Sequence, residues 1–387
     1  MVSSSGEPGV KTLLFLTGGP YFWPHQKTVR LKYELLSEHF EGFILSFVSR
    51  REWCGVPVGR FELVGRWVSG RVYAMLPIRL VLRVLFTLGA GLRLHFLRRR
   101  IDVIVAPDPF LTGVLAWILS LATRARFIVE VNNDFQSPAN WGVQSRNVLT
   151  FLKSFYVRLV TPFVLNRAHG VRLLYPTQVA GFRRLRNPEK YACFHDFVAT
   201  RLFASTASVP HRILFVGHPW YTKGVDVLLR AFGAVSPEYP DYSLRIVGYL
   251  PEREQHRGLF AGNPRIEFVG PLMPDAIIEQ MRDCSVLVLP SRSEGMPRVL
   301  IEAMASGTPI IASRVGGIPH YISHGETGLL FDREDVDTLA KLLREVLGDA
   351  THRRLLGERG MRYARTHLSD DCYAEGMSRL ITRVAGS

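Results

Sequence analysis

Glu294 and Glu302 are the two carboxylates in this sequence whose surroundings most strongly suggest chemistry. Glu294 belongs to the polar loop 291–296, and Glu302 lies eight residues later inside the apolar run 299–305. Eight residues are about two and a quarter helical turns, so both carboxylates can border one crevice. A helix N-terminus between them offers unpaired N–H groups and a positive dipole end, which suits a phosphate. The alternative is that Glu294 is a solvated loop residue and Glu302 an exposed helical one.

The elements around these glutamates form one recognisable unit. Residues 286–289 are a continuous apolar run, typical of a strand buried on both faces of a parallel sheet. Pro297 is expected as the first helical residue, because its ring fixes φ and its missing N–H would be unpaired there. The helix should end at Gly307, and residues 308–312 return to a strand pattern. The segment is therefore predicted to be a βαβ crossover with a ligand-sized loop.

The string S-R-S-E-G-M-P-R-V-L-I-E-A-M-A-S-G-T-P-I-I-A, followed by G-G-I-P and G-E-T-G-L-L-F, resembles the signature of the family-4 retaining glycosyltransferases. The resemblance is strong over residues 212–347 and looser before them. It implies the α/β GT-B fold, in which two Rossmann-like domains face each other across a cleft. The Glu-x7-Glu pair of the family corresponds to Glu294 and Glu302.

The resemblance also implies roles in the second half of the chain. Lys223 matches the lysine that neutralises the donor diphosphate, and His218 stands after Gly217 where the family has arginine. Histidine is a weaker and pH-dependent phosphate partner, so turnover should fall as pH rises past its pKa. Glu302 would accept hydrogen bonds from the ribose, while the loop holds the donor sugar. The implied catalytic residues are Glu294, Lys223, His218 and Asn132, and the implied donor-binding residues are Gly217, Gly295, Met296, Pro297, Arg298 and Glu302.

In the first half the match weakens at two positions. Asn132 stands where the family has a sugar-contacting histidine, and Ala199 stands where an aspartate is usual. Asn132 could still hydrogen-bond a sugar hydroxyl but cannot titrate. The T-G-G-P turn after the strand 12–16 places Gly18 and Gly19 where a backbone can approach a ligand, so we expect an acceptor-side loop there.

The length of 387 residues favours two domains. We expect an N-terminal acceptor-side domain over 1–204 and a nucleotide-sugar-binding domain over 211–367, joined by a small-residue linker at 204–210. The resemblance implies that a last helix, 368–387, crosses back to the first domain. Five or so strands alternating with helices predict a Rossmann-like layer in the first half.

Charge is concentrated in the first half of the chain. Residues 1–210 contain 27 Lys and Arg against 12 Asp and Glu, a net charge of 27 − 12 = +15, whereas the remainder has 21 against 22. This excess indicates an anionic partner such as a phospholipid surface, a nucleic acid or an acidic substrate; a basic genome composition is the alternative. In residues 71–100, Arg79 and Arg83 lie one turn apart in an apolar helix, typical of an interfacial helix or of a core crossover helix.

Compartment signals favour an intracellular protein. The four cysteines have no metal-like spacing and lie mostly in apolar sequence, which indicates a reducing compartment. Residues 13–16 are too short for a signal-peptide core, and Pro107, Asp108 and Pro109 interrupt the apolar stretch 103–122, so neither a leader nor a spanning helix is expected. The predicted location is cytoplasmic, or peripheral on the inner face of a membrane.

These observations predict a retaining, hexosyltransferase-type enzyme that moves a sugar from a nucleotide-diphosphate sugar to a saccharide or lipid-linked saccharide, in polysaccharide or glycolipid biosynthesis. No cofactor or metal is expected, because many enzymes of the GT-B fold that the resemblance implies need none. The alternatives are a catalytically impaired sugar-nucleotide-binding protein, or another GT-B enzyme such as an epimerase or phosphorylase. No G-x-G-x-x-G follows a strand, which disfavours an oxidoreductase, and no nucleic-acid-binding module is present. Base, sugar, acceptor and linkage stay open.

Overall fold

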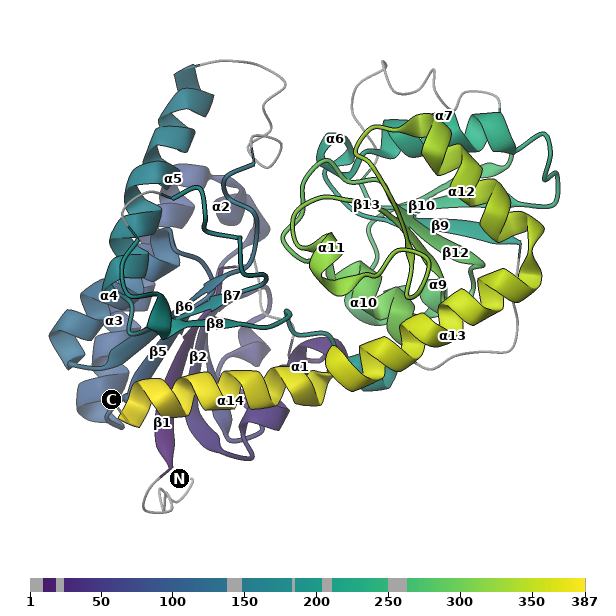
Figure 1. Cartoon of the computed structure of the whole chain (residues 1–387). Helices are drawn as coiled ribbons and strands as arrows, with labels where there is room; N and C mark the ends of the chain where they lie inside the picture. The colour runs from purple at the N-terminus through teal and green to yellow at the C-terminus, as the bar shows by residue number, and fades with distance from the viewer. Residues whose placement is uncertain are drawn as a thin grey trace. The chain divides into compact units, whose positions relative to one another are not determined.

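The computed structural model describes residues 10–18, 24–137, 148–182, 185–203, 211–249 and 263–386. The chain divides into two compact units, each built around its own sheet (Figure 1). The first comprises Met1–Asn132, Ser154–Phe194 and Tyr373–Ser387, and the second comprises Asn133–Lys153 and His195–Cys372. The last helix, α14 (Asp370–Gly386), therefore packs in the first unit from Tyr373 onward.

The predicted first domain runs to residue 204, whereas residues 195–203 belong to the second unit. Hydrogen bonds explain this difference. Arg201 Nε donates to Asp370 Oδ2 at 2.6 Å, and Thr200 Oγ1 donates to Asp370 Oδ1 at 3.2 Å. The predicted linker 204–210 lies outside the described residues.

The first unit contains an eight-stranded sheet, parallel apart from one antiparallel edge pair, β3 and β4. Its inner strands are buried on both faces because they are continuous apolar runs, such as VIVA in β5. The sequence pattern did not predict β3 and β4 at one end of the sheet or β7 and β8 at the other, because these strands are short or contain polar residues. The order is β3 (Pro57–Val58), β4 (Phe61–Trp67), β2 (Phe40–Val48), β1 (Lys11–Leu16), β5 (Val103–Ala106), β6 (Arg126–Val131), β7 (Gly170–Leu173) and β8 (Tyr191–Cys193).

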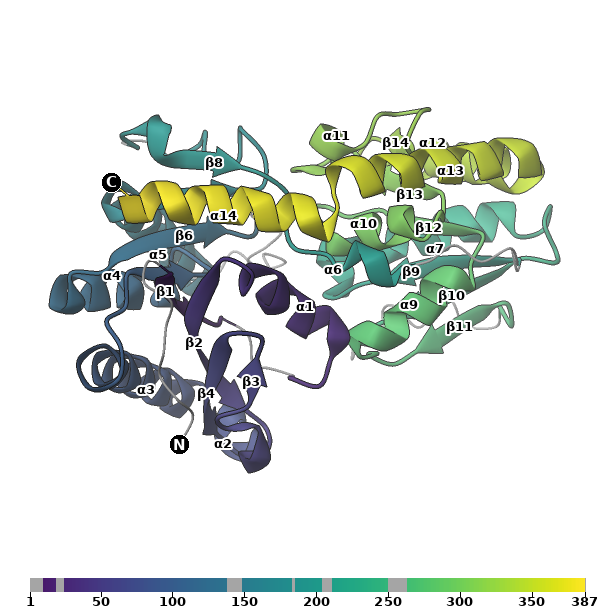
Figure 2. The ribbon, with the colours of Figure 1, turned by 90° about the horizontal axis from the view of Figure 1, so that it is seen from below.

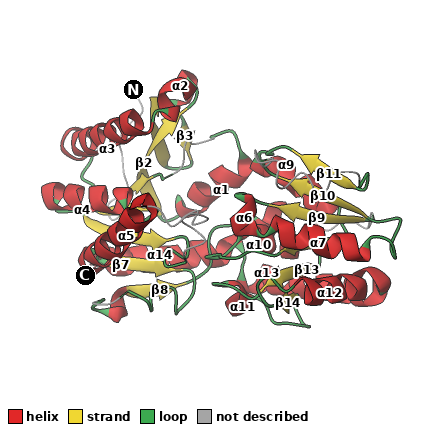
Figure 3. Cartoon of the chain, turned by 90° about the horizontal axis from the view of Figure 1, so that it is seen from above, coloured by secondary structure: helices red, strands yellow, loops and turns green. Residues whose placement is uncertain are grey.

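Helices cover both faces of this sheet. Right-handed crossovers put α3, α4 and α5 on one face and α1 on the other, as Figure 3 shows. The predicted 71–100 helix is broken at Met75, which is extended. The helices are α1 (Lys27–Leu36), α2 (Gly70–Ala74), α3 (Leu76–Leu97), α4 (Leu111–Thr123), α5 (Val148–Arg167) and α14, with a 3-10 turn at Arg51–Trp53.

The second unit contains a six-stranded, wholly parallel sheet. All six strands lie within about two residues of the ranges that the sequence pattern predicts, because most of them are apolar runs between turn residues. The predicted ranges are 212–216, 244–248, 266–270, 286–289, 308–312 and 328–331. Figure 2 shows the same sheet from below. The order is β11 (Ile266–Val269), β10 (Ser243–Val247), β9 (Arg212–Val216), β12 (Val286–Leu289), β13 (Ile310–Ser313) and β14 (Leu329–Phe331).

Two helices of the second unit, α12 and α13, begin directly after an aspartate whose side chain caps them. The side chain of Asp335, for example, accepts a hydrogen bond from the Thr338 N–H at 2.9 Å and so caps α12. Pro297 is the N-cap of α10 and not its first helical residue. The segment 194–203 forms no strand and contains the 3-10 turn Thr200–Leu202. The helices are α6 (Trp220–Lys223), α7 (Val225–Val235), α9 (Pro274–Arg282), α10 (Arg298–Ala305), α11 (Ile318–Tyr321), α12 (Val336–Gly348) and α13 (Ala350–His367).

All four cysteines are free thiols. Cys284 is buried, and burial raises the pKa of its thiol to about 12. Cys54 and Cys193 are exposed, so the expectation that the cysteines lie mostly in apolar surroundings is wrong for these two. Short apolar stretches in sequence do not decide which side chains the fold covers.

Candidate active site

The loops that follow β9 and β12 meet at one edge of the second sheet. The two strands are parallel neighbours, with Leu214 opposite Leu287. The carboxyl ends of parallel strands are where open α/β sheets bind ligands. Lys223 comes from the first loop and Glu294 from the second, 71 residues apart in the chain.

Lys223 and Glu294 form an ion pair with 2.6 Å between Nζ and Oε1. The same carboxylate oxygen accepts a hydrogen bond from Ser291 Oγ at 2.5 Å. Glu294 is only 6% exposed, so an ionised carboxylate requires such partners there. The pair places one cation and one carboxylate side by side at the sheet edge.

Glycines allow the backbone turns that bring Lys223 to this position. Gly224 ends α6 with φ +67°, and a Cβ at this residue would lie 1.9 Å from the Pro290 carbonyl oxygen. A side chain on Gly217 would approach Lys223 Cγ to 3.1 Å, so the lysine stem passes directly over the Gly217 backbone. The Lys-Gly pair in the sequence thus reflects both a charge and a close approach of two loops.

Arg292 ties these loops together, and the sequence interpretation missed it. Its guanidinium is bidentate to Asp226 at 2.8 Å and donates to the Tyr221 carbonyl at 2.6 Å. Nε also donates to Glu334 Oε1 at 2.8 Å. Hydrogen bonds and charge from Asp226 and Glu334 outweigh the effect of burial and raise the Arg292 pKa. The sequence feature that could have indicated this role is the position of the arginine, between two serines and just before Glu294.

The end of β13 and the loop that follows it contact the backbone of the loop that carries Glu294. Gly317 N–H donates to the Gly295 carbonyl at 2.9 Å, and Ser313 Oγ donates to the Ser291 carbonyl at 2.5 Å. Gly316 has φ +53°, and a Cβ there would lie 1.8 Å from the Glu294 carbonyl oxygen. The G-G-I-P string is therefore needed for the close backbone contact that shapes the 294–296 loop.

Glu302 lies on α10 and is only partly accessible. No described residue donates a hydrogen bond to its carboxylate. Burial raises its pKa, and the charge of Arg298 opposes that rise. At the start of the helix, no side chain caps the N-terminus at Pro297. Acceptor oxygens on Glu302 and donor N–H groups in the first turn of α10 are thus available to a ligand.

His218 is exposed after β9, with its ring 4.9 Å from the Tyr249 ring between centroids. Burial lowers the pKa of the imidazole, and the charge of Lys223 lowers it further. The side chain is therefore mainly neutral near pH 7, where it donates only one hydrogen bond.

The remaining predicted residues lie elsewhere. Both ends of the Asn132 amide are occupied within the first unit, because Nδ2 donates to the Pro107 carbonyl at 2.9 Å and Oδ1 accepts from the buried Arg172. Gly18 follows β1, and a Cβ on it would lie 3.3 Å from Asp108 Oδ2. Gly19 lies outside the described residues. Ala199 is buried and precedes the 3-10 turn at Thr200.

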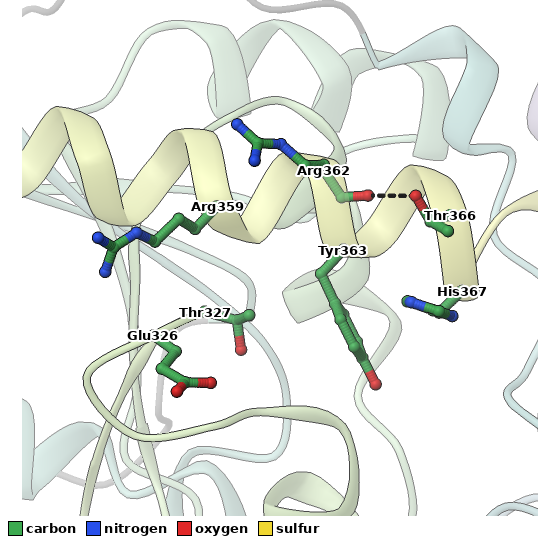
Figure 4. A pocket seen from close by; sticks show the side chains of 7 residues that line it. All are labelled: Glu326, Thr327, Arg359, Arg362, Tyr363, Thr366 and His367. Atoms are coloured by element: carbon green, nitrogen blue, oxygen red, sulfur yellow. Dashed lines mark hydrogen bonds between the residues drawn. The ribbon is translucent and has the colours of Figure 1, made fainter.

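A pocket of about 540 Å³ lies in the second unit, between α13 and the loop before β14. Figure 4 shows the side chains that line it. None of the predicted site residues lines it. Its lining residues are Glu326, Thr327, Arg359, Arg362, Tyr363, Thr366 and His367. In the described part of the chain, no cluster of three or more His, Cys, Asp or Glu side chains could hold a metal ion.

Comparison with known proteins identifies the family. Residues 204–363 match the family described as glycosyl transferases group 1, and residues 28–195 match the glycosyl transferase 4-like domain. The chain belongs to the group 1, family-4 type of glycosyltransferases. Lys223, Glu294 and Glu302 all lie inside the first matched segment.

Curated relatives of this glycosyltransferase match it over part of their length. D-inositol 3-phosphate glycosyltransferase from Corynebacterium glutamicum is 35% identical over 163 residues, which are 40% of this chain and 39% of the relative. Sulfoquinovosyl transferase from Arabidopsis thaliana is 36% identical over 138 residues, 35% of this chain and 27% of the relative. The matched segments thus span about two fifths or less of these relatives.

Solved structures match almost the whole glycosyltransferase chain. Sucrose-phosphate synthase from Thermosynechococcus elongatus has a TM-score of 0.76 at 20% identity and covers 97% of this chain and 100% of its own. HepE from Anabaena, in complex with UDP, has a TM-score of 0.69 at 17% identity, with 96% and 99% covered. The likeness establishes the GT-B fold that the sequence predicted.

Proposed function

We propose that this glycosyltransferase moves a sugar from a nucleotide-diphosphate sugar to a saccharide or lipid-linked saccharide, with retention at the anomeric carbon. One observation carries the proposal. The Lys223 ammonium lies 2.6 Å from the Glu294 carboxylate at neighbouring strand ends, on loops that lead to the uncapped N-terminus of α10. A cation and free N–H groups suit a diphosphate, and a carboxylate suits sugar hydroxyls.

The reaction follows from these groups. The bond between the anomeric carbon and the diphosphate oxygen breaks, and the acceptor hydroxyl oxygen bonds to the same carbon on the same face. The hydroxyl proton passes to the departing diphosphate. Lys223 and the α10 dipole offset the negative charge that grows on the leaving oxygen, which lowers the barrier.

We assign Glu302 to binding of the nucleoside ribose and the 294–296 loop to binding of the donor sugar. The Glu302 carboxylate receives no hydrogen bond from a described residue, so it can accept two from the ribose hydroxyls without losing others. Uridine is the first base to test, because the HepE structures of similar fold contain UDP and UDP-glucose.

Thermal unfolding with UDP-, GDP- and ADP-sugars tests the donor site. A ligand at about 100 times its Kd stabilises the native state by about 2.7 kcal/mol. We expect one nucleotide family to raise the Tm, and Lys223→Met to abolish most of the rise. Lys341→Met, on the exposed face of α12, is the matched control and should keep it.

Absence of any shift for all three families, or equal shifts in both lysine variants, would overturn the site assignment. The measurement is repeated with EDTA, because we propose that donor binding needs no metal. A shift that disappears with EDTA and returns with Mg²⁺ would refute that part alone. Transfer to saccharide and lipid-linked acceptors is then measured with the preferred donor, and proton NMR of the product reports the anomeric configuration.

A further inference from the structure

The outward stripe of α3 is apolar, contrary to the pattern of a surface helix. Ile78, Val81, Leu85 and Phe96 follow helical spacing, and their exposed fractions are 41%, 58%, 65% and 65%. A crossover helix on a sheet normally turns its polar face to water and its apolar face to the core. Here the large apolar side chains are on the water side.

The inward side of the same helix carries a charge. Arg83 is 9% exposed, its Nη1 donates to the Thr17 carbonyl at 2.6 Å, and its guanidinium lies 5.1 Å from the Phe47 ring centroid. The sequence left an interfacial helix and a core crossover helix as alternatives for this segment, and Arg83 agrees with the second, because its side chain is used inside the unit. Apolar side chains thus lie on the outward side of α3 as well as against the sheet, and the outward ones are exposed for contact.

The neighbouring helices extend this apolar surface. Leu121 at the end of α4 is 65% exposed, and Phe155 and Leu159 on α5 are 58% and 61% exposed. The crossovers place α3, α4 and α5 on the same face of the sheet, as Figure 3 shows. We call the exposed residues of these three helices the three-helix face. Exposed apolar side chains spread over several elements mark an interaction surface more than single ones do.

The charge on the three-helix face has one sign. The sequences of α3, α4 and α5 contain no Asp or Glu. Arg93 on α3, Arg124 after α4 and Arg158 on α5 are exposed, and none forms an ion pair with a described residue. At the end of α3, Arg98 is paired with Glu62 at 2.9 Å. Apolar side chains mixed with cations and no acids complement an anionic lipid surface.

Length and composition alone would also allow α3 to span a membrane. In the described residues, Pro77–Leu97 is the one helix long and apolar enough, with a mean hydropathy of 1.6 and 22% of the window buried. The apolar stretch 103–122 that the sequence singled out instead contains strand β5 and helix α4. However, α3 connects β4 to β5 and is held to β1 through Arg83, so leaving the unit would break these contacts.

We propose that the three-helix face docks on an anionic bilayer, with α3 lying in the plane of the interface and its outward apolar side chains inserted among the headgroups. Arg93, Arg124 and Arg158 contact the lipid phosphates. The surface is defined by side chains of the first unit alone, so this proposal does not depend on the transfer reaction proposed above. It commits to a membrane and not to a second copy of the chain.

Vesicle co-sedimentation of the full chain tests this surface. We expect binding to mixed phosphatidylglycerol and phosphatidylcholine vesicles, weaker binding to phosphatidylcholine alone, and a decrease as salt rises. The double substitution Leu85→Glu with Phe96→Glu should lower the partition coefficient about tenfold or more, because it removes two inserted side chains and adds two repelled charges. Both residues are exposed, so we expect an unchanged Tm.

Leu355→Glu is the matched control, since Leu355 is a 38% exposed leucine on α13 in the second unit and should not affect partitioning. Binding that survives the double substitution, or no binding to anionic vesicles at low salt, would overturn the proposal. Retention in the membrane after carbonate extraction would show a spanning helix and refute the interfacial arrangement. Sedimentation equilibrium without lipid tests the alternative that a second copy of the chain binds this face. A dimer that the double variant dissociates would assign the three-helix face to that second copy and overturn the proposal.

Discussion

Replacing Glu302 with glutamine should stabilise the free protein while weakening its donor binding. The carboxylate receives no hydrogen bond from a described residue, and burial raises its pKa. The folded state therefore opposes ionisation of this group at neutral pH. Glutamine has nearly the same shape without the charge, so the variant should have the higher free energy of unfolding at pH 7.

The raised pKa of Glu302 also predicts how the stability difference between the variant and the wild type changes with pH. A glutamate whose folded pKa is raised makes the folded state less stable as pH rises from the unfolded pKa of about 4.3 to the folded value. Above that pH range, the folded state has lost the full amount of stability that ionisation of Glu302 costs. The Glu302→Gln variant should lack this component, so its advantage should appear only above about pH 4.3 and reach a plateau. Each kcal/mol gained should raise the Tm by about 2 to 4 °C for a domain of this size.

Donor binding should change in the opposite direction. A hydrogen bond to a charged group contributes about 1.5 to 3 kcal/mol, against about 0.5 to 1.5 kcal/mol for a neutral one. If two ribose hydroxyls donate to Glu302, glutamine should cost about 2 to 3 kcal/mol, or roughly 30- to 150-fold in Kd. This is the pattern of a residue kept for binding at the expense of stability.

Denaturant unfolding across pH and calorimetric titration with UDP provide the two measurements. Glu326→Gln is the control, because Glu326 is an exposed loop glutamate and its replacement should change neither quantity. A Glu302→Gln protein that is less stable at pH 7 would show that the carboxylate has a structural partner. An unchanged Kd for the nucleotide that stabilises the wild type would show that Glu302 does not contact the ligand.

Three further outcomes follow from the geometry. Arg292→Met should lower the free energy of unfolding by about 2 to 4 kcal/mol in denaturant titrations, because it removes the bidentate partner of the partly buried Asp226 and the donor to the Tyr221 carbonyl; a loss below 1 kcal/mol, on the order of a surface pair, would contradict this. Gly316→Ala should abolish donor binding and lower the Tm, whereas Gly233→Ala, in open space within α7, should raise stability by about 0.5 to 1 kcal/mol. Lys223→Met should raise the His218 pKa in an NMR titration, since the lysine charge lowers it; an unmoved resonance would mean that the two side chains are not electrostatically coupled.

The sequence was most informative where structure is local. Apolar runs such as 286–289 and 212–216, each bounded by turn residues, predicted the parallel strands of the second unit. The Lys-Gly pair at 223–224 and the two glutamates could be assigned to loops and helix after those strands. Periodicity and turn chemistry depend on neighbouring residues, so they can be read without knowing the fold.

Long-range contacts could not be read in this way. Lys223 and Glu294 are 71 residues apart, and only the parallel register of β9 and β12 brings them within 2.6 Å. The role of Arg292, in the loop after β12, likewise depends on Asp226, which reaches it from helix α7. Side chains that are distant in sequence meet because of strand order, and strand order depends on packing of the whole unit.

The orientation of α3 shows the same division. The sequence by itself determined that residues 71–100 contain a long apolar helix with arginines one turn apart, because composition and spacing are local properties. Only the tertiary structure decided that Arg83 is inside and Leu85 is outside. A helix with apolar residues on most sides has no single preferred buried face, so the choice depends on which inner groups can satisfy the charge. Here the carbonyl of Thr17 at the end of β1 does so.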